Sequence, residues 1–169
     1  LSARARENGL AFAYLNLVGG QDELVFDGCS FAVERGGRIV QRLPAFEESL
    51  AVFDVVASDK GLDLQPDRLA PLPAGEESVW RALVLGVRDY VEKHRFAGVV
   101  IGLSGGVDSA LVLAITCDAI GPSRVHAVMM PSRFTSEISG NDAAAMARGL
   151  GVHCSTIPIE GMYQAALAA

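Results

Sequence analysis

The second half of the chain alternates short apolar segments with longer helical patterns, and this alternation restricts the possible folds more than any other feature. Residues 98–103 form a continuous apolar run, as expected of a strand buried on both faces. Two further strands are predicted at residues 124–130 and 152–159. Helices are predicted at residues 76–95, 109–120, 139–150 and 160–169. Strands that alternate with helices favour right-handed crossovers and a parallel sheet, so we expect an α/β fold here.

The first half of the chain is rich in patterns typical of strands. Strands are predicted at residues 11–18, 24–26, 31–34, 38–42 and 51–56, the third and fourth forming a hairpin. Residues 1–9 are predicted to end a helix at Gly9. Residues 59–75 contain three prolines, which exclude an uninterrupted helix or a central strand. We therefore expect a linker there, joining two structural units.

The composition excludes several classes of function. Half of the residues are hydrophobic, which excludes a disordered chain. No apolar run approaches the ~18 residues that cross a bilayer, so we expect no membrane partner. The net charge of −6 argues against nucleic acid as a partner, since contacts to phosphates need a basic face. Three scattered cysteines favour a reducing, cytoplasmic setting over a disulfide framework or a zinc site.

The most informative motif is Gly102-Leu-Ser-Gly-Gly-Val-Asp-Ser109, which lies between a predicted strand and a predicted helix. Ligands of open parallel sheets bind beyond the carboxyl ends of the strands. The two adjacent glycines let the backbone approach a ligand closely, and the helix N-terminus adds unpaired N–H groups. The two serines add hydroxyl donors. These groups predict a phosphate site, with Asp108 as a Mg²⁺ ligand, because a carboxylate beside phosphate needs a cation between them.

The residues alone leave other interpretations of this motif open. The loop lacks the lysine of a Walker A motif, and its glycines have the wrong spacing for a dinucleotide-binding turn. Gly102-x-Ser104-x-Gly106 also matches the nucleophile elbow of serine hydrolases, with Asp142 and His153 following in the required order as acid and base. A tight turn without any ligand is the third interpretation.

Residues 104–109 resemble the ATP loop, SGGxDS, of the adenine-nucleotide α-hydrolase superfamily, which includes NAD, GMP and asparagine synthetases. The resemblance implies that the second half is an incomplete part of a doubly wound parallel sheet. It also implies ATP and Mg²⁺ as ligands, and adenylylation of a substrate with release of pyrophosphate. The implied ATP-binding residues are Gly102, Leu103, Ser104, Gly105, Gly106, Val107, Asp108 and Ser109, with Asp108 also holding the metal.

Other segments narrow the resemblance to glutamine-dependent NAD synthetases. The segments that carry it are residues 18–28, 30–31, 44–48, 53–54 and 130–136. The resemblance implies that residues 1–58 are the strand-rich C-terminal part of an α+β, nitrilase-like glutaminase domain. Residues 59–75 are then a linker, and residues 76–169 are the N-terminal part of the synthetase domain.

The implied reaction is adenylylation of deamido-NAD and its amidation to NAD⁺ with ammonia from glutamine. By the family's order, the glutaminase Glu, Lys and Cys precede Leu1, so we expect an internal fragment without glutaminase activity, from a homo-oligomer that acts on small molecules. Cys29, Cys117 and Cys154 are expected to be structural thiols. Met129 and Met130 are expected to pack in the core rather than to touch adenine. Arg133 is expected to be a solvated charge rather than a contact to ATP phosphates or the substrate. A GMP synthetase or another SGGxDS amidotransferase, and a catalytically silent remnant, remain alternatives.

Overall fold

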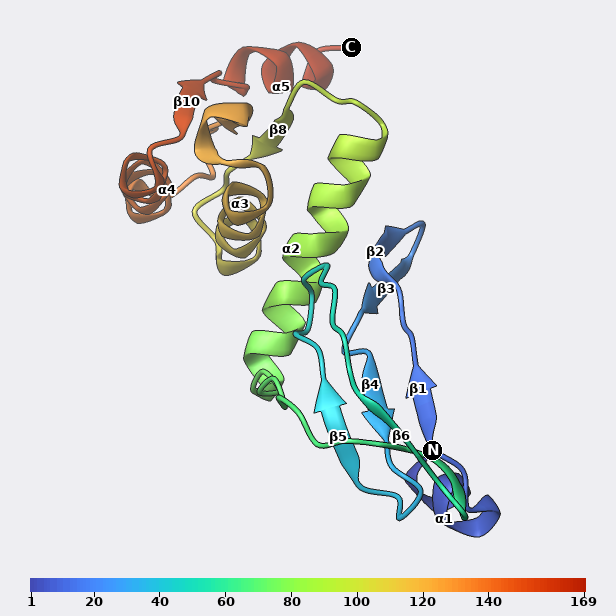
Figure 1. Cartoon of the computed structure of the whole chain (residues 1–169). Coiled ribbons are helices and arrows are strands. Elements are labelled where there is room, and N and C mark those ends of the chain that lie inside the picture. Colours follow the sequence, from blue (N-terminus) through green and yellow to red (C-terminus); the bar gives the residue numbers. More distant parts are fainter. The chain divides into compact units, whose positions relative to one another are not determined.

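The computed structural model describes all 169 residues, which form two compact units, Leu1–Gly86 and Val87–Ala169. The helix α2 (Gly75–Lys93) contains the boundary between them. Each unit has its own strands, paired only within that unit (Figure 1). Each also has its own hydrophobic core. The candidate site lies in the second unit.

The second unit contains a parallel sheet of three strands in the order β10-β9-β8. The strands are β8 (Val99–Gly102), β9 (Val125–Met129) and β10 (His153–Thr156). The helical elements that follow α2 are α3 (Val107–Ile120), η1 (Pro122–Arg124), α4 (Glu137–Leu150) and α5 (Glu160–Leu167). Val100 pairs with His126, and His126 pairs with His153, both in parallel register. The parallel α/β arrangement predicted for this half is confirmed.

Helices α3 and α4 cover the sheet as neighbours. Helix α3 contacts β8 and β9, α4 contacts β9 and β10, and the two helices contact each other (Figure 1). Between them, Leu113 of α3 is fully buried, and Ala143 and Ala147 of α4 are almost fully buried. These alanines are one helical turn apart and have small side chains, which lets α4 lie close to the rest of the core.

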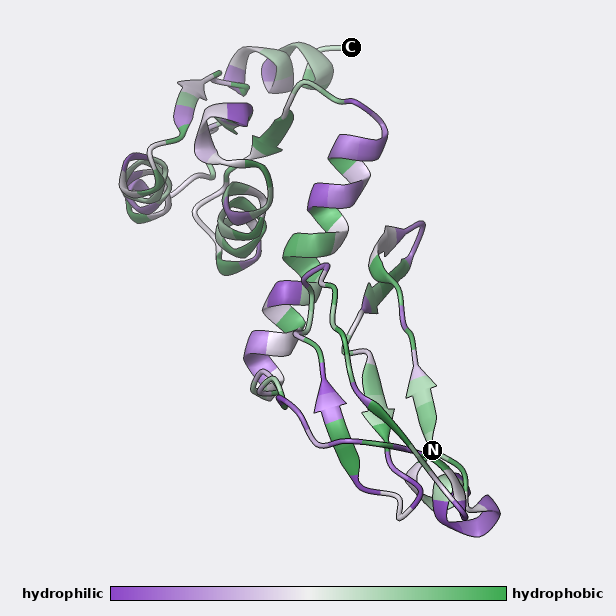
Figure 2. Cartoon of the chain, in the orientation of Figure 1, coloured by the Kyte–Doolittle hydropathy of each residue, from purple (hydrophilic) through white to green (hydrophobic).

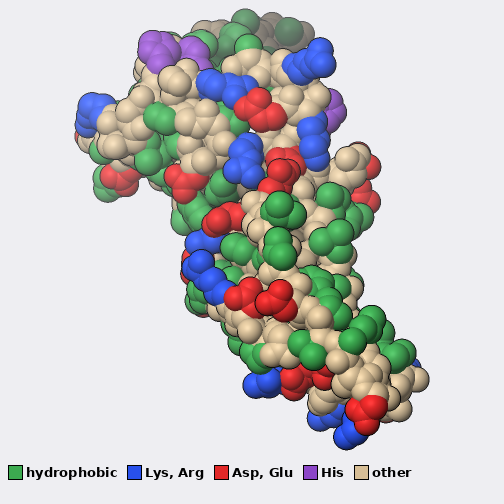
Figure 3. Space-filling model, viewed as in Figure 1, with side chains coloured by type: hydrophobic (Ala, Val, Ile, Leu, Met, Phe, Trp, Pro, Cys, Tyr) green, Lys and Arg blue, Asp and Glu red, His purple; other side chains and the backbone are tan.

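Helix α3 is apolar along most of its length (Figure 2). Its buried residues are Leu113, Ile115, Thr116, Cys117 and Ala119. Its apolar character extends beyond the buried face, because Val107, Leu111 and Val112 are exposed. Hydrophobic side chains reach the surface in both units, where they are interspersed with charges (Figure 3).

The first unit is built from short antiparallel strands. One sheet has the order β1-β4-β5, and two separate hairpins pair β2 with β3 and β6 with β7. The bounds are β1 (Phe12–Tyr14), β2 (Val18–Gln21), β3 (Leu24–Asp27), β4 (Phe31–Val33), β5 (Ile39–Arg42), β6 (Val55–Ser58) and β7 (Gly61–Leu64). The core is small and centres on Ala32, Val40 and Leu64. Helix α1 (Ser2–Asn8) ends at Gly9 in the left-handed conformation, as predicted.

Three expectations for the first unit differ from the structure. The strand predicted at residues 11–18 contains only β1 and the first residue of β2, because Asn16 between them bonds locally. Its amide nitrogen Nδ2 donates to Asp27 Oδ1 at 3.0 Å, and its oxygen Oδ1 accepts the Leu17 N–H at 3.0 Å. The strand predicted at residues 51–56 begins only at Val55.

The third difference is that β7 lies inside the predicted linker. The cause is a tight turn after β6, in which the Ser58 hydroxyl accepts the Lys60 N–H at 3.2 Å and donates to the Gly61 carbonyl at 3.1 Å. Gly61 has φ +104°, which suits glycine. Short polar residues that stabilise a turn in this way permit a hairpin where proline content alone predicted a linker.

Helix α2 matches the helix predicted at residues 76–95 to within two residues at each end. Acidic residues occupy its first turn and Lys93 its last, which complements the helix dipole. Along the helix, Arg81 pairs with Glu77 at 2.8 Å, and Lys93 pairs with Asp89 at 3.2 Å. No helix of the chain has both the length and the apolar content needed to span a bilayer.

Candidate functional site

The loop between β8 and α3 has a backbone that only glycine can adopt at its centre. Gly105 has φ +83°, and a Cβ added there would lie 2.1 Å from the Ser139 carbonyl oxygen on α4. A side chain would therefore overlap the backbone of the neighbouring helix. The loop turns sharply because it is pressed against α4, and this contact fixes where its amides lie.

Two serines order the same loop from within. The hydroxyl oxygens of Ser104 and Ser109 are 3.0 Å apart, and the Ser104 N–H donates to Ser109 Oγ at 3.2 Å. Ser109 Oγ also donates to the Gly106 carbonyl at 3.0 Å, and the Gly106 N–H donates to Ser104 Oγ at 3.2 Å. These contacts link both ends of the loop, so its conformation is set before any ligand arrives.

The N-terminus of α3 is open, in contrast to that of α4. Gly106 occupies the N-cap of α3 and provides no side-chain cap, so the first amides of the helix lack an intrahelical acceptor. In α4, Ser136 Oγ accepts the Ser139 N–H at 3.1 Å and caps the helix. Open amides and the positive end of the α3 dipole favour an anion beside this loop.

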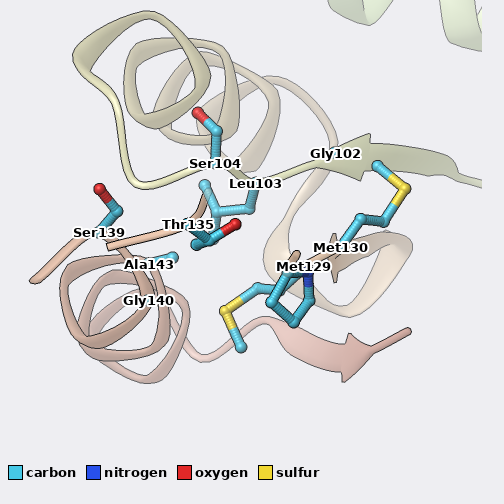
Figure 4. A pocket seen from close by; sticks show the side chains of 10 residues that line it. Gly102, Leu103, Ser104, Met129, Met130, Thr135, Ser139, Gly140 and Ala143 are labelled. Carbon is cyan, nitrogen blue, oxygen red and sulfur yellow. The ribbon is translucent and has the colours of Figure 1, made fainter. Parts of the chain in front are cut away.

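A pocket of about 270 Å³ adjoins the loop. Its lining residues are Gly102, Leu103, Ser104, Met129, Met130, Pro131, Thr135, Ser139, Gly140 and Ala143. Figure 4 shows Met130 and Ser139 at opposite ends of the pocket, with the Ser104 hydroxyl directed toward α3. The carboxyl ends of β8 and β9 and the first turns of α4 thus form one cavity with mainly apolar walls.

The pocket corrects one expectation about the methionines and adds residues that the sequence did not identify. Met129 packs against the core as predicted, but it also lines the pocket, and Met130 is half exposed at the pocket wall. Thr135, Ser139 and Gly140 were not predicted as site residues. Helix α4 begins at Glu137, two residues before the predicted start, and this first turn brings Ser139 to the loop.

The serine hydrolase interpretation is wrong, because the histidine that it requires does not lie near Ser104. His153 pairs with His126, which pairs with Val100, four residues before Ser104. At about 3.3 Å per residue, His153 lies roughly 13 Å from Ser104 along the strand direction, and two strands away. The His153 ring packs against His126 at 4.6 Å between centroids, and the Ser104 hydroxyl contacts Ser109 instead. No base reaches the serine.

The Asp108 carboxylate is placed where it could bind a divalent cation together with an anion held by the loop. It is exposed in the first turn of α3, beside the open amides. The chain contains no cluster of three or more metal-ligating side chains, so it offers no cage made of protein groups alone. Mg²⁺ typically takes one or two carboxylates and completes its shell with water and substrate phosphates. A single aspartate beside open amides that favour an anion is compatible with that arrangement.

The cysteines have the structural character predicted for them. Burial and the nearby Asp27 carboxylate raise the pKa of the Cys29 thiol, which disfavours the reactive thiolate. Cys117 is buried, its pKa is also raised by burial, and Cys154 is half-buried in β10. Cys29 lines a second pocket of about 400 Å³ in the first unit.

Arg133 is exposed, as expected of a solvated charge, but it is also paired. Its Nε donates to Glu160 Oε1 at 2.8 Å, and its guanidinium lies over the Tyr163 ring at 5.6 Å from the centroid. Both partners are on α5, and Glu160 is 27 positions away in the sequence, so no local pattern could reveal the pair.

The sequence and the structure of the chain are similar to those of known NAD synthetases. The chain is 47% identical over 159 residues to a glutamine-dependent NAD(+) synthetase of Rhodobacter capsulatus, covering 94% of this chain and 29% of that protein. A solved structure of glutamine-dependent NAD+ synthetase from Acinetobacter baumannii, in complex with ADP, is 42% identical with a TM-score of 0.93, covering 99% of this chain and 31% of that one. An NH3-dependent NAD synthetase from Campylobacter jejuni, in complex with the nitrate ion, has a TM-score of 0.53 and 26% identity, covering 57% of this chain and 42% of that one.

The chain therefore spans about 30% of the length of the full-length relatives that it matches. Residues 79–169, which include the loop and the pocket, match the family described as NAD synthase. This match extends over more than half of the chain. The chain belongs to the NAD synthase family.

Proposed function

We propose that the second unit binds ATP with its phosphates on the 102–109 loop. The observation that carries the proposal is the open N-terminus of α3 behind a loop that Gly105 presses against α4. Backbone amides there supply donors for phosphate oxygens. The Ser104 and Ser109 hydroxyls bond within the loop and hold those amides in place. The set proposed for ATP is Gly102, Leu103, Ser104, Gly105, Gly106, Val107, Asp108 and Ser109.

We propose that the adjoining pocket receives the adenosine part of the nucleotide. The pocket shares residues 102–104 with the loop, so a ligand in it is continuous with a phosphate on the loop. Its walls carry Leu103 and the two methionines, and a flat aromatic base suits such apolar, polarizable walls.

In this proposal Asp108 holds a Mg²⁺ ion together with the ATP phosphates. When bound, the ion neutralises negative charge that develops on the departing pyrophosphate. The residues of the chain hold and orient the triphosphate, since amides fixed by the Ser104–Ser109 contacts need little reorganisation as charge develops.

We further propose that the full-length protein adenylylates deamido-NAD and amidates it to NAD⁺ with ammonia from glutamine. Residues 1–58 would then be the end of a nitrilase-like glutaminase domain and residues 76–169 the start of the synthetase domain. Residues 59–75 would connect them and also contribute β7 to the first unit. The identity to glutamine-dependent synthetases over 94% of the chain supports both parts. The three free cysteines support a reducing cytoplasmic setting. A homo-oligomer is proposed for the full-length protein and can be tested by light scattering.

Calorimetric titration of this chain with ATP in the presence and absence of Mg²⁺ tests the nucleotide site. We expect Mg²⁺-dependent binding, and we expect Asp108→Asn to remove most of the Mg²⁺ dependence. Asp142→Asn is the matched control, because Asp142 is an exposed aspartate on α4. Binding that Asp108→Asn leaves unchanged, or no binding by the wild-type chain, would contradict the proposal.

Activity of the full-length protein tests the substrate. We expect ATP-dependent conversion of deamido-NAD with glutamine as the nitrogen source. Xanthosine monophosphate serves as the comparison substrate, and its preferential use would indicate a GMP synthetase instead.

A further inference from the structure

The loop between β9 and α4 forms one wall of the pocket but contributes little to the core. Pro131 and Thr135 line the pocket, whereas Arg133 and Phe134 are exposed, Phe134 by 74%. Burial of apolar surface therefore cannot fix this loop. Its position must come from other contacts.

One carboxylate on α5 makes most of those contacts. Glu160 Oε2 accepts the backbone N–H of Arg133 at 3.1 Å, and Glu160 Oε1 accepts Arg133 Nε at 2.8 Å and a second guanidinium nitrogen. Gln164 Nε2 also donates to Glu160 Oε1, at 2.9 Å. A carboxylate that binds both the side chain and the backbone of one loop residue holds that residue in a single geometry.

Ring contacts and backbone hydrogen bonds extend the same attachment. The Phe134 and Tyr163 rings meet edge to face at 5.6 Å between centroids. The Ile159 N–H donates to the Pro131 carbonyl at 3.0 Å. Helix α5 buries none of its residues, so these polar and ring contacts with the loop are also what attach the helix.

We propose that Arg133 and Glu160 are positioning residues that hold residues 130–136 in the shape that forms the base side of the nucleotide pocket. This inference rests on the proposed ATP site, because it assigns the loop to the adenosine part of the ligand. Neither residue of the ion pair lines the pocket. The pair acts through Pro131 and Thr135, which lie two residues to either side of Arg133.

If the ion pair has this role, its loss should weaken binding of the adenosine part of ATP but not binding of the phosphates. ATP uses both the pocket and the 102–109 loop, whereas inorganic tripolyphosphate uses the loop alone. A loss of the pair should therefore weaken binding of ATP–Mg²⁺ and leave binding of tripolyphosphate–Mg²⁺ unchanged. General destabilisation of the unit would weaken both.

The test compares Glu160→Gln, Arg133→Gln and the double variant by calorimetry with both ligands. We expect each single variant to raise the Kd for ATP–Mg²⁺ roughly 2- to 5-fold, and the double variant to add little, because exposed ion pairs contribute modestly and the two residues act as one unit. Arg133→Lys, which keeps the charge but loses the two-pronged contact, should fall between wild type and Arg133→Gln. Glu137→Gln, which removes one exposed carboxylate from the same unit, should leave the Kd unchanged.

Hydrogen exchange at the Arg133 and Ile159 amides supplies a readout that needs no ligand. Glu160→Gln should speed exchange at both amides, and Glu137→Gln should not. The inference is overturned if exchange at these amides is unchanged, if Arg133→Gln weakens tripolyphosphate binding as much as ATP binding, or if additive effects show that the residues act separately. A different result would separate the two proposals. If the wild-type chain did not bind ATP, but Glu160→Gln still sped amide exchange at Arg133 and Ile159, both the proposed function and the role of the ion pair in the nucleotide pocket would be overturned. The ion pair would then only attach the loop to α5.

Discussion

At the scale of single residues, two positions with positive φ have opposite chemical character. Gly105 has φ +83° and no side chain, and the neighbouring Ser139 carbonyl leaves no room for one. Cys29 has φ +50° although it carries a Cβ, directly after Gly28 at φ +70°. The first position is suited to its conformation, whereas the second is strained.

We predict that Gly105→Ala destabilises the second unit by about 2 to 4 kcal/mol, because it combines an unfavourable φ with overlap against a helix backbone. ATP binding should be lost as well. Gly149→Ala is the matched control, since a Cβ at this position in α4 meets nothing within 4 Å, and it should stabilise the helix by about 0.5 to 1 kcal/mol. Urea unfolding measures both. Equal effects of the two substitutions would contradict the assigned packing.

We predict that Cys29→Gly is more stable than Cys29→Ala by about 1 kcal/mol, since only the alanine retains a Cβ in the left-handed conformation. Both variants remove the thiol, so their difference isolates the backbone strain. Denaturant unfolding gives the two free energies. If the alanine variant were the more stable one, the strain at this position would be refuted.

At the scale of elements, helix ends decide where a ligand can bind. Helices α3 and α4 both begin beside the pocket, but Ser136 caps α4 while Gly106 leaves α3 without a side-chain cap. The sequence predicted unpaired N–H groups at this end of α3, but it placed the start of the helix at Ser109, two residues late. It placed the start of α4 two residues late, since Ser136 and Ser139 both suit an N-cap and only packing distinguishes them.

The Arg133–Glu160 contact gives a pH prediction at the same scale. Hydrogen bonds from Arg133 and Gln164 lower the pKa of Glu160 from 4.5 to about 2. A carboxylate with a lowered pKa contributes stability above its unfolded pKa and loses it as the pH falls toward the folded one. The attachment of α5 should therefore be complete above about pH 4.5 and be lost between pH 4.5 and 2. Carbon-detected NMR titration of the Glu160 carboxyl measures this, and a midpoint near 4.5 would contradict the geometry.

At the scale of the whole molecule, each unit has a core of its own. Leu113 is fully buried in the second unit, and Val33 is fully buried in the first. The second core draws on α3, α4 and all three strands, whereas the first centres on Ala32, Val40 and Leu64. The stability of each unit should accordingly respond to its own core residues.

We predict that Leu113→Ala lowers the stability of the second unit by about 2 to 5 kcal/mol, through the cavity that it leaves. Amide exchange of β4 and β5 in the first unit should remain as in wild type. Val33→Ala is the reciprocal variant and should affect exchange only in the first unit. Mass-spectrometric hydrogen exchange follows both units together, and an equal loss of protection in both after either substitution would show a single cooperative unit.

Local patterns in the sequence determined the strands and helices of the second unit and the sharp turn of the 102–109 loop, because hydrophobic periodicity and glycine position act over a few residues. They did not determine the β6–β7 hairpin, where the hydrogen bonds of Ser58 form the turn. Only the tertiary structure decided that Ser139 presses on Gly105, that Glu160 holds Arg133, and that His153 is far from Ser104. These relations join residues that are far apart along the chain, and their distances are set by how strands and helices pack.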